Sequence, residues 1–123
     1  MTKWDKYGIH SKLETILAST AINHNHGVRD YLDAYQLAIE FAKKNPKEFA
    51  SLGKPIGGKG TGQRNSLSEY IAGQLSKRIK AGTITNIEIA YVADLHVVDK
   101  EYSGKVISSL TGMFSLSMYR LRD

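Results

Sequence analysis

The sequence predicts an α+β fold, with N-terminal helices followed by a C-terminal antiparallel sheet. In the first two thirds of the chain, apolar residues recur three and four positions apart, which is the spacing of one helix face. From Ile87 onward the apolar period becomes two, which is typical of half-buried strands. Helices first and strands last is the order expected of an α+β fold. The length of 123 residues fits one domain, 1–123.

The first helix is expected over residues 11–19. Ser11 and Glu14 have the spacing of a capping box, in which the hydroxyl accepts from one backbone amide and the carboxylate from another. Leu13 and Ile16 then begin a buried face. The following segment, INHNHGV, is rich in Asn and ends near a Gly, so we expect a loop there.

The second helix is expected over residues 31–44, with Asp30 or Asp33 as its cap. Pro46 should end this helix, because the residue before a proline is pushed away from helical angles. Residues 47–52 are expected to add one more short turn of helix.

The third helix, which begins after Ser66, is the most clearly marked. Ser66 and Glu69 repeat the capping-box spacing, and Gly82 lies where a left-handed C-cap is expected. Gly73 lies in the helix interior, where glycine costs about 1 kcal/mol relative to alanine. This cost suggests that a partner approaches the backbone closely at Gly73. The apolar stripe expected to face the core is Leu67, Ile71, Leu75 and Ile79.

Strands are expected over residues 87–98, 106–110 and 114–121, where apolar and polar residues alternate. The intervening segment DKEYSGK is expected to be a turn, with Ser103 and Gly104 at its tip.

The basic excess of the chain is concentrated in its middle third. The formal net charge is +5. Residues 43–80 contain nine basic and two acidic residues, a net +7, and the remainder contains eight basic and ten acidic residues, a net −2. Such asymmetry favours a polyanionic partner. The alternative is a solvated surface that is merely basic.

The absence of cysteine excludes disulfides and thiolate metal sites, and it favours a reducing compartment. The N-terminal segment has no apolar run that could serve as a secretory signal, and no segment reaches the roughly 20 apolar residues needed to span a bilayer. We therefore expect a cytoplasmic protein without a membrane partner.

The stretch GKPIGGKGTGQRNS, residues 53–66, is a basic glycine-rich loop. Gly58 and Lys59 approach the pattern of a nucleotide-phosphate loop, but Gly60 occupies the place of the Ser or Thr that would bind magnesium. The loop also follows a helix instead of a strand. What remains is a loop that leads into the free amides of a helix start, where anions bind well. Lys59 and Arg64 would add positive charge; the alternative is a flexible connector.

Other chemical motifs are sparse. His24 and His26 lie in a polar loop with no obvious third ligand, so we expect no metal site there. No Gly-x-Ser-x-Gly elbow and no thiol nucleophile are present. We therefore expect neither a cofactor nor an enzymatic activity.

The segment SLSEYIAGQLSKRIKAGTI, followed by strands, resembles the recognition helix and opening strand of winged helix-turn-helix DNA-binding domains. Two earlier helices and a hairpin after this segment complete that order of elements. The resemblance covers about residues 11–121 and rests on element order. One departure is the long glycine-rich loop, since the turn before a recognition helix is usually short.

The resemblance implies roles for individual residues. The helix from Ser66 would enter the major groove of DNA, and such domains commonly form homodimers. Base edges would be contacted by Asn65, Tyr70 and Gln74. Phosphates would be contacted by Lys54, Lys59, Arg64, Lys77 and Lys80. The wing would carry Lys100, Tyr102 and Lys105.

Together these features predict a small basic nucleic-acid-binding protein, with double-stranded DNA favoured over RNA and a role in transcription regulation. Two alternatives stay open. One is a protein-interaction module or inhibitor that uses a basic face. The other is an enzyme that acts on a phosphorylated or nucleotide ligand.

Overall fold

The computed structural model describes residues 2–20, 25, 27–56, 66–92, 100–102, 105–107 and 116–122. Helices occupy most of the N-terminal two thirds and strands most of the remainder, which confirms the α+β prediction. The elements are α1 (Lys3–Lys6), α2 (Ile9–Ala18), β1 (Leu32–Asp33), α3 (Ala34–Lys44), α4 (Pro46–Leu52), α5 (Leu67–Lys80), β2 (Ile87–Val92), β3 (Lys100–Tyr102), β4 (Lys105–Ile107) and β5 (Leu116–Leu121).

The first helical region differs from its prediction. A short α1 precedes α2, and the Thr2 hydroxyl caps it by accepting from the Asp5 amide at 3.2 Å. Between the two helices, Gly8 adopts a left-handed conformation with φ of 58°, which glycine tolerates without steric cost. Helix α2 therefore begins after Gly8 and not at Ser11. The expected capping box is absent, because the Ser11 hydroxyl donates to the Gly8 carbonyl and Glu14 contacts other side chains.

Helix α3 begins three residues later than predicted. Asp33 and Gln36 form a reciprocal capping box: the Asp33 carboxylate accepts from the Gln36 amide, and the Gln36 side chain accepts from the Asp33 amide, both at 2.9 Å. Of the two predicted caps, the structure selects Asp33. Pro46 follows the end of α3 and occupies the first turn of α4, where its missing amide proton costs nothing.

The sheet joins segments from both halves of the chain. Its strand order is β1–β5–β2, and both pairings are antiparallel. β5 is central, with Leu32 opposite Tyr119 on one side and Ile87 opposite Leu121 on the other. The predicted sequence of helices and strands did not include β1, whose two residues were assigned to the second helix.

The strands are shorter than predicted. The described part of the first strand, β2, ends at Val92, and residues 93–99 lie outside the described residues. Much of the segment expected to be a turn is instead a two-stranded antiparallel hairpin of β3 and β4. Its expected tip, Ser103 and Gly104, also lies outside the described residues.

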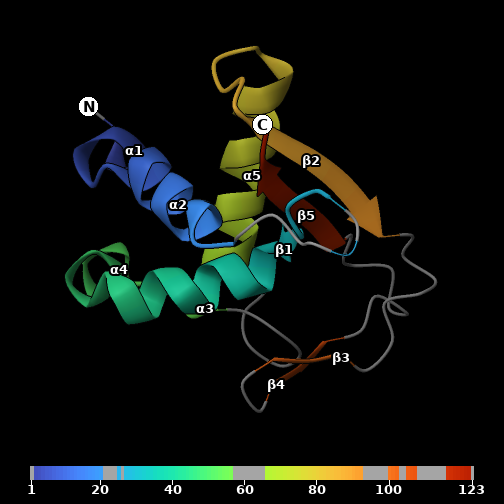
Figure 1. The fold of residues 1–123 in the computed structure, drawn as a ribbon. Helices are drawn as coiled ribbons and strands as arrows, with labels where there is room; N and C mark the ends of the chain where they lie inside the picture. The colour runs from blue at the N-terminus through green and yellow to red at the C-terminus, as the bar shows by residue number, and fades with distance from the viewer. Residues whose placement is uncertain are drawn as a thin grey trace.

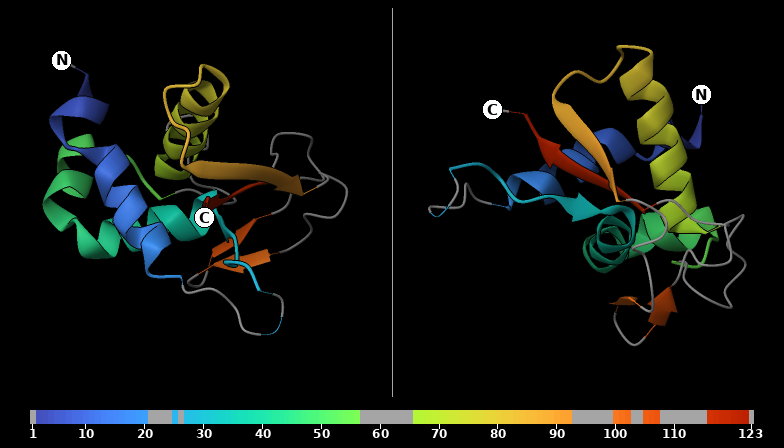
Figure 2. Two further views of the ribbon diagram at one scale, coloured as in Figure 1. Left: turned by 45° about the horizontal axis from the view of Figure 1, so that its top comes forward. Right: turned by 90° about the vertical axis from the view of Figure 1, so that its right-hand side faces the viewer.

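Helix α5 lies at the centre of the molecule. Figure 1 shows α1 and α2 on one side of α5, the strands β2 and β5 on the other, and α3 crossing beneath. The views in Figure 2 agree with this arrangement, in which α3 packs against both α5 and α2. The core side chains that are completely buried include Leu13, Leu37, Phe41, Ile71, Leu75, Ile87 and Tyr119.

Within the part of the chain that the structure describes, no helix is both long and apolar enough to cross a membrane. The described residues also contain no group of three or more His, Asp or Glu side chains that could hold a metal ion. His24 and His26 lie outside the described residues.

Candidate nucleic-acid interface

Helix α5 is fixed to the core by one apolar side. Leu67, Ile71 and Leu75 are buried as the four-residue spacing predicted, and Ile79 is half-buried at the end of the stripe. Ser66 caps the helix, since its hydroxyl accepts from the Glu69 amide at 3.1 Å. The helix thus presents a defined opposite face to solvent.

The exposed face of α5 consists of Glu69, Gly73, Lys77 and Lys80. These positions are spaced by three and four residues, so they lie within one arc of the helix surface. Lys77 and Lys80, two of the predicted phosphate contacts, are therefore brought together at the C-terminal end. This end also suits cations, because the helix dipole is negative there.

Gly73 has no packing partner that would require a glycine. Among the described residues, nothing lies within 4 Å of the position that a Cβ atom on Gly73 would occupy. The backbone at Gly73 is therefore open to an approaching molecule, and packing inside the described fold does not explain the glycine.

Tyr70, a predicted base contact, lies at the edge of this face and is half-buried. Its ring packs edge-on against Trp4 with 6.2 Å between ring centroids, and the Lys54 ammonium lies 5.4 Å from the Tyr70 centroid. Desolvation raises the pKa of the Tyr70 hydroxyl, and the Arg78 charge opposes that rise. Tyr70 and Lys54 thus form part of the junction between α5 and α1.

Gln74 is the second predicted base contact and is also half-buried. Its side-chain oxygen accepts from Arg78 Nη2 at 3.2 Å, and the Arg78 guanidinium lies 4.9 Å from the centroid of the Trp4 ring. Gln74 therefore sits beside α1 and does not share the arc of Lys77 and Lys80. The sequence reading did not single out Trp4 or Arg78. The four-residue spacing of Tyr70, Gln74 and Arg78 is the signal that could have placed Arg78 on this side.

The start of α5 differs from its prediction. It was expected to offer free amides to an anion, but the first amides already have acceptors. Leu67 N donates to Pro55 O at 2.6 Å, and Ser68 N donates to Ile56 O at 3.0 Å. With the Glu69 amide bound to the cap, this helix start is closed by protein groups and is not an anion site.

Three predicted contacts, Lys59, Arg64 and Asn65, lie outside the described residues. The predicted wing residues fall on the β3–β4 hairpin, with Lys100 and Tyr102 on β3 and Lys105 on β4. Tyr102 pairs with Lys105 next to the two residues that join the strands.

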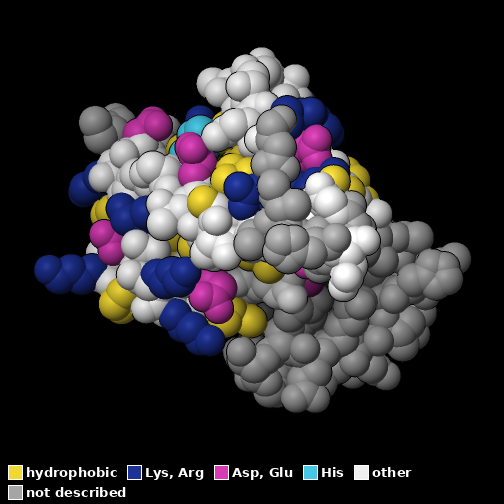
Figure 3. Space-filling model, viewed as in Figure 1, with side chains coloured by type: hydrophobic (Ala, Val, Ile, Leu, Met, Phe, Trp, Pro, Cys, Tyr) yellow, Lys and Arg dark blue, Asp and Glu magenta, His cyan; other side chains and the backbone are white. Residues whose placement is uncertain are grey.

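The basic excess does not form a uniform patch on every side of the molecule. On the face drawn in Figure 3, lysine and arginine side chains are interspersed with acidic ones. Several of these charges are paired at close range. Arg120 Nε lies 2.6 Å from Glu88 Oε2, and Lys43 Nζ lies 3.9 Å from Glu40 Oε1. The exposed face of α5 is thus a more specific candidate than net charge alone.

Comparison with protein-family models, with curated proteins and with solved structures finds no match to this chain.

Proposed function

We propose that this chain is a small DNA-binding protein that places the exposed face of α5 in the major groove. One observation carries the proposal: α5 is buried along one side, while Gly73, Lys77 and Lys80 face solvent together on the other. An exposed glycine lets a partner approach the helix backbone, and the two lysines can contact phosphates.

The shape of the element favours DNA over RNA. The major groove of B-DNA is about 12 Å wide and admits an α-helix. The major groove of A-form RNA is deep and narrow, so side chains on a helix do not read it. A role in transcription regulation and a homodimeric state belong to the same proposal, since dimers match paired half-sites on DNA.

The placement of side chains refines the proposed contacts. Lys77 and Lys80 are the phosphate contacts that the described residues support best. Tyr70 and Gln74 are held beside α1, so base reading through them would require their present contacts with Lys54 and Arg78 to be exchanged. Glu69 lies on the exposed face and would accept hydrogen bonds from a cytosine amino group or repel a phosphate.

The test is fluorescence anisotropy with a random-sequence duplex, from about 50 to 200 mM salt, because phosphate contacts make binding salt-dependent. The wild type is compared with the double variant Lys77→Gln/Lys80→Gln. If both lysines contact phosphate, the slope of log K against log salt becomes less negative by about 1.8, since each contact contributes about 0.9.

A matched control is Lys43→Gln/Lys44→Gln, which removes the same charge from exposed positions at the end of α3. An equal loss of binding in both double variants would assign the effect to net charge and not to α5. A third variant, Lys59→Ala/Arg64→Ala, measures the contribution of the glycine-rich loop. No binding by the wild type even at low salt would overturn the DNA proposal and favour a protein partner.

A further inference from the structure

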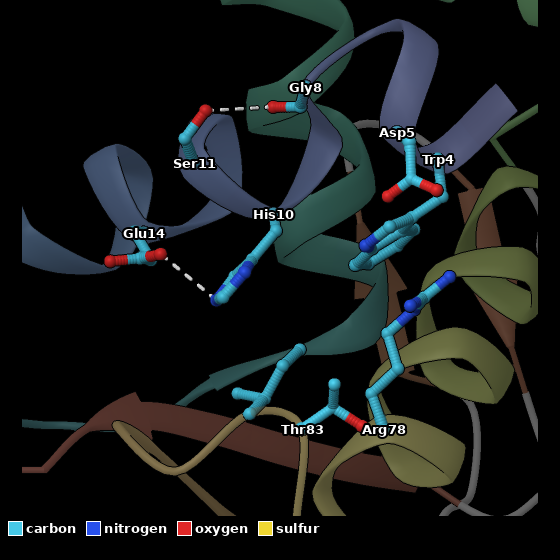
Figure 4. Close-up of a pocket in the computed structure, with 9 residues that line it drawn as sticks. Trp4, Asp5, Gly8, His10, Ser11, Glu14, Arg78 and Thr83 are labelled. Carbon is cyan, nitrogen blue, oxygen red and sulfur yellow. Dashed lines mark hydrogen bonds and ion pairs between the residues drawn. The ribbon is translucent and has the colours of Figure 1, made fainter. Parts of the chain in front are cut away.

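A cavity of about 340 Å³ lies between the N-terminal helices and the C-terminal end of α5. Figure 4 shows His10 and Glu14 of α2 on one side of it, with Arg78 and Thr83 across from them and Trp4 and Asp5 beside Arg78. The volume is at the lower end of the range for small-ligand sites, about 300–1,000 Å³. The cavity is separate from the exposed face of α5 that carries Lys77 and Lys80.

Two buried nitrogen atoms in the walls have unmet hydrogen-bonding capacity. Among the described side chains, the buried polar atoms without a hydrogen-bond partner are His10 Nε2 and Arg78 Nε, and both residues line this cavity. His10 Nε2 lies 2.9 Å from Glu14 Oε1, a close contact that does not have hydrogen-bond geometry. A buried polar group without a partner is unusual in a folded protein, so a ligand or water that supplies the partner is expected.

Arg78 is held in place before any ligand binds. Its Nη2 donates to Gln74 at 3.2 Å, and its guanidinium lies over the Trp4 ring at 4.9 Å from the centroid. These contacts fix the plane of the guanidinium and leave the Nε–H without an acceptor. Arginine binds carboxylates in a fixed planar geometry, so an immobilised guanidinium loses little entropy on binding one.

Acidic groups accompany the arginine in the same walls. Glu14 Oε2 accepts from Asn86 Nδ2 at 3.0 Å, which holds its carboxylate in position. Asp5 accepts from the Thr2 hydroxyl at 2.9 Å. A purely anionic ligand would therefore meet two carboxylates, whereas a purely cationic ligand would meet the guanidinium. A ligand that carries both charges is complementary to both groups.

We propose that this cavity binds a small zwitterion of α-amino acid size. Its carboxylate accepts from Arg78 Nε–H, and its ammonium group faces the acidic side formed by Asp5 and Glu14. This inference does not rest on DNA binding.

Trp4 provides the readout, since it is the single tryptophan of the chain and lies in the cavity wall. Each common α-amino acid is titrated into the full chain while Trp4 fluorescence is recorded. The N-acetylated and the methyl-ester forms serve as ligand controls, because they lack the ammonium group and the carboxylate respectively. The expected result is a saturable change with at least one amino acid and at least tenfold weaker binding of both blocked forms.

Two variants test the assigned contacts. Arg78→Lys keeps the charge but removes the Nε–H and is expected to weaken binding at least tenfold. Arg122→Lys is the matched control, because Arg122 pairs with Glu88 away from the cavity, and it should bind like the wild type. If Arg78→Lys fails to fold, as judged by circular dichroism, Glu14→Gln and the blocked ligands decide the question.

Three results would overturn the proposal. The first is that no amino acid changes Trp4 fluorescence or the amide resonances of α1 and α5 in a saturable way, which would leave a cavity that holds water only. The second is that Arg78→Lys binds as well as the wild type. The third is that acetate alone binds as tightly as any amino acid, which would make the site one for simple anions.

Discussion

Gly73 is the residue whose identity the described fold explains least. It lies in the interior of α5, where glycine costs about 1 kcal/mol relative to alanine. A Cβ atom there would meet nothing within 4 Å, so an alanine would fit. The absence of any internal reason for the glycine is what makes an external partner the better explanation.

Gly73→Ala is therefore expected to separate stability from binding. The free energy of unfolding should rise by about 1 kcal/mol, because alanine restricts the unfolded chain and favours helix. Affinity for duplex DNA should fall, because a methyl group obstructs close approach to the backbone. Urea unfolding and fluorescence anisotropy on the same samples measure the two effects.

The control for this change is Gly82→Ala. Gly82 has φ of 77°, a left-handed conformation that strains any residue with a Cβ atom, so this substitution should destabilise the protein. The two changes are chemically identical and should have opposite signs. Unchanged DNA affinity in Gly73→Ala would remove the close-approach argument while leaving the lysine contacts to their own test.

The capping box of α3 shows how a single element is fixed at its start. Asp33 is buried, caps α3 and also belongs to β1, where it pairs with Met118 of β5. A defect at this residue therefore acts on the helix and on the adjoining strand together. Helix start and sheet edge are coupled at one position of the chain.

Asp33→Ala should lower the free energy of unfolding by about 1–2 kcal/mol, the upper part of the range for loss of a helix cap. Asp33→Asn retains a capping oxygen and should cost much less. Thermal unfolding followed by circular dichroism compares the two variants. Equal losses in both would show that the negative charge of Asp33, and not its capping hydrogen bond, stabilises the structure.

The sheet closes the molecule through Tyr119 on its central strand. The Tyr119 hydroxyl donates to Ser117 Oγ at 2.7 Å and approaches the Ala72 carbonyl of α5 at 3.5 Å. The ring is completely buried where sheet and helix meet. Desolvation raises the pKa of Tyr119 to about 12, against an ordinary value of 10.0. Burial, followed by the charge of Asp33, raises the pKa of Tyr35 to about 12 as well.

These raised pKa values predict alkaline unfolding. Below pH 10 both tyrosines are protonated in the folded and unfolded states, so their burial is fully compatible with stability. Between about pH 10 and 12 the unfolded chain loses these protons while the folded chain keeps them, so stability falls as pH rises. The loss should reach roughly 2–3 kcal/mol per tyrosine near the upper limit.

Urea unfolding at several pH values between 9 and 12, together with tyrosinate absorbance, measures this effect. Tyr119→Phe should reduce the slope of stability against pH, although it also removes the hydrogen bond to Ser117. A slope as steep in Tyr119→Phe as in the wild type would contradict the assignment of the alkaline transition to Tyr119.

The sequence by itself determined the α+β order, the buried stripe of α5 and the caps at Asp33, Ser66 and Gly82. These features depend on spacing and hydrogen bonds within a few residues, so local patterns carry them. It did not predict that Leu32 and Asp33 leave the helix to form β1. That outcome depends on β5, more than eighty residues away, which local periodicity cannot register.

The same limit applies to the candidate sites. The sequence placed Lys77 and Lys80 on an exposed helix face, and the tertiary structure agrees because both lie opposite the apolar stripe. Only the tertiary structure decided that Pro55 and Ile56 close the start of α5. Contacts with α1, which no sequence pattern announced, also decided that Arg78 lies over Trp4 beside a cavity. Local periodicity fixes which side of a helix is buried, but packing between distant segments fixes what each remaining side chain touches.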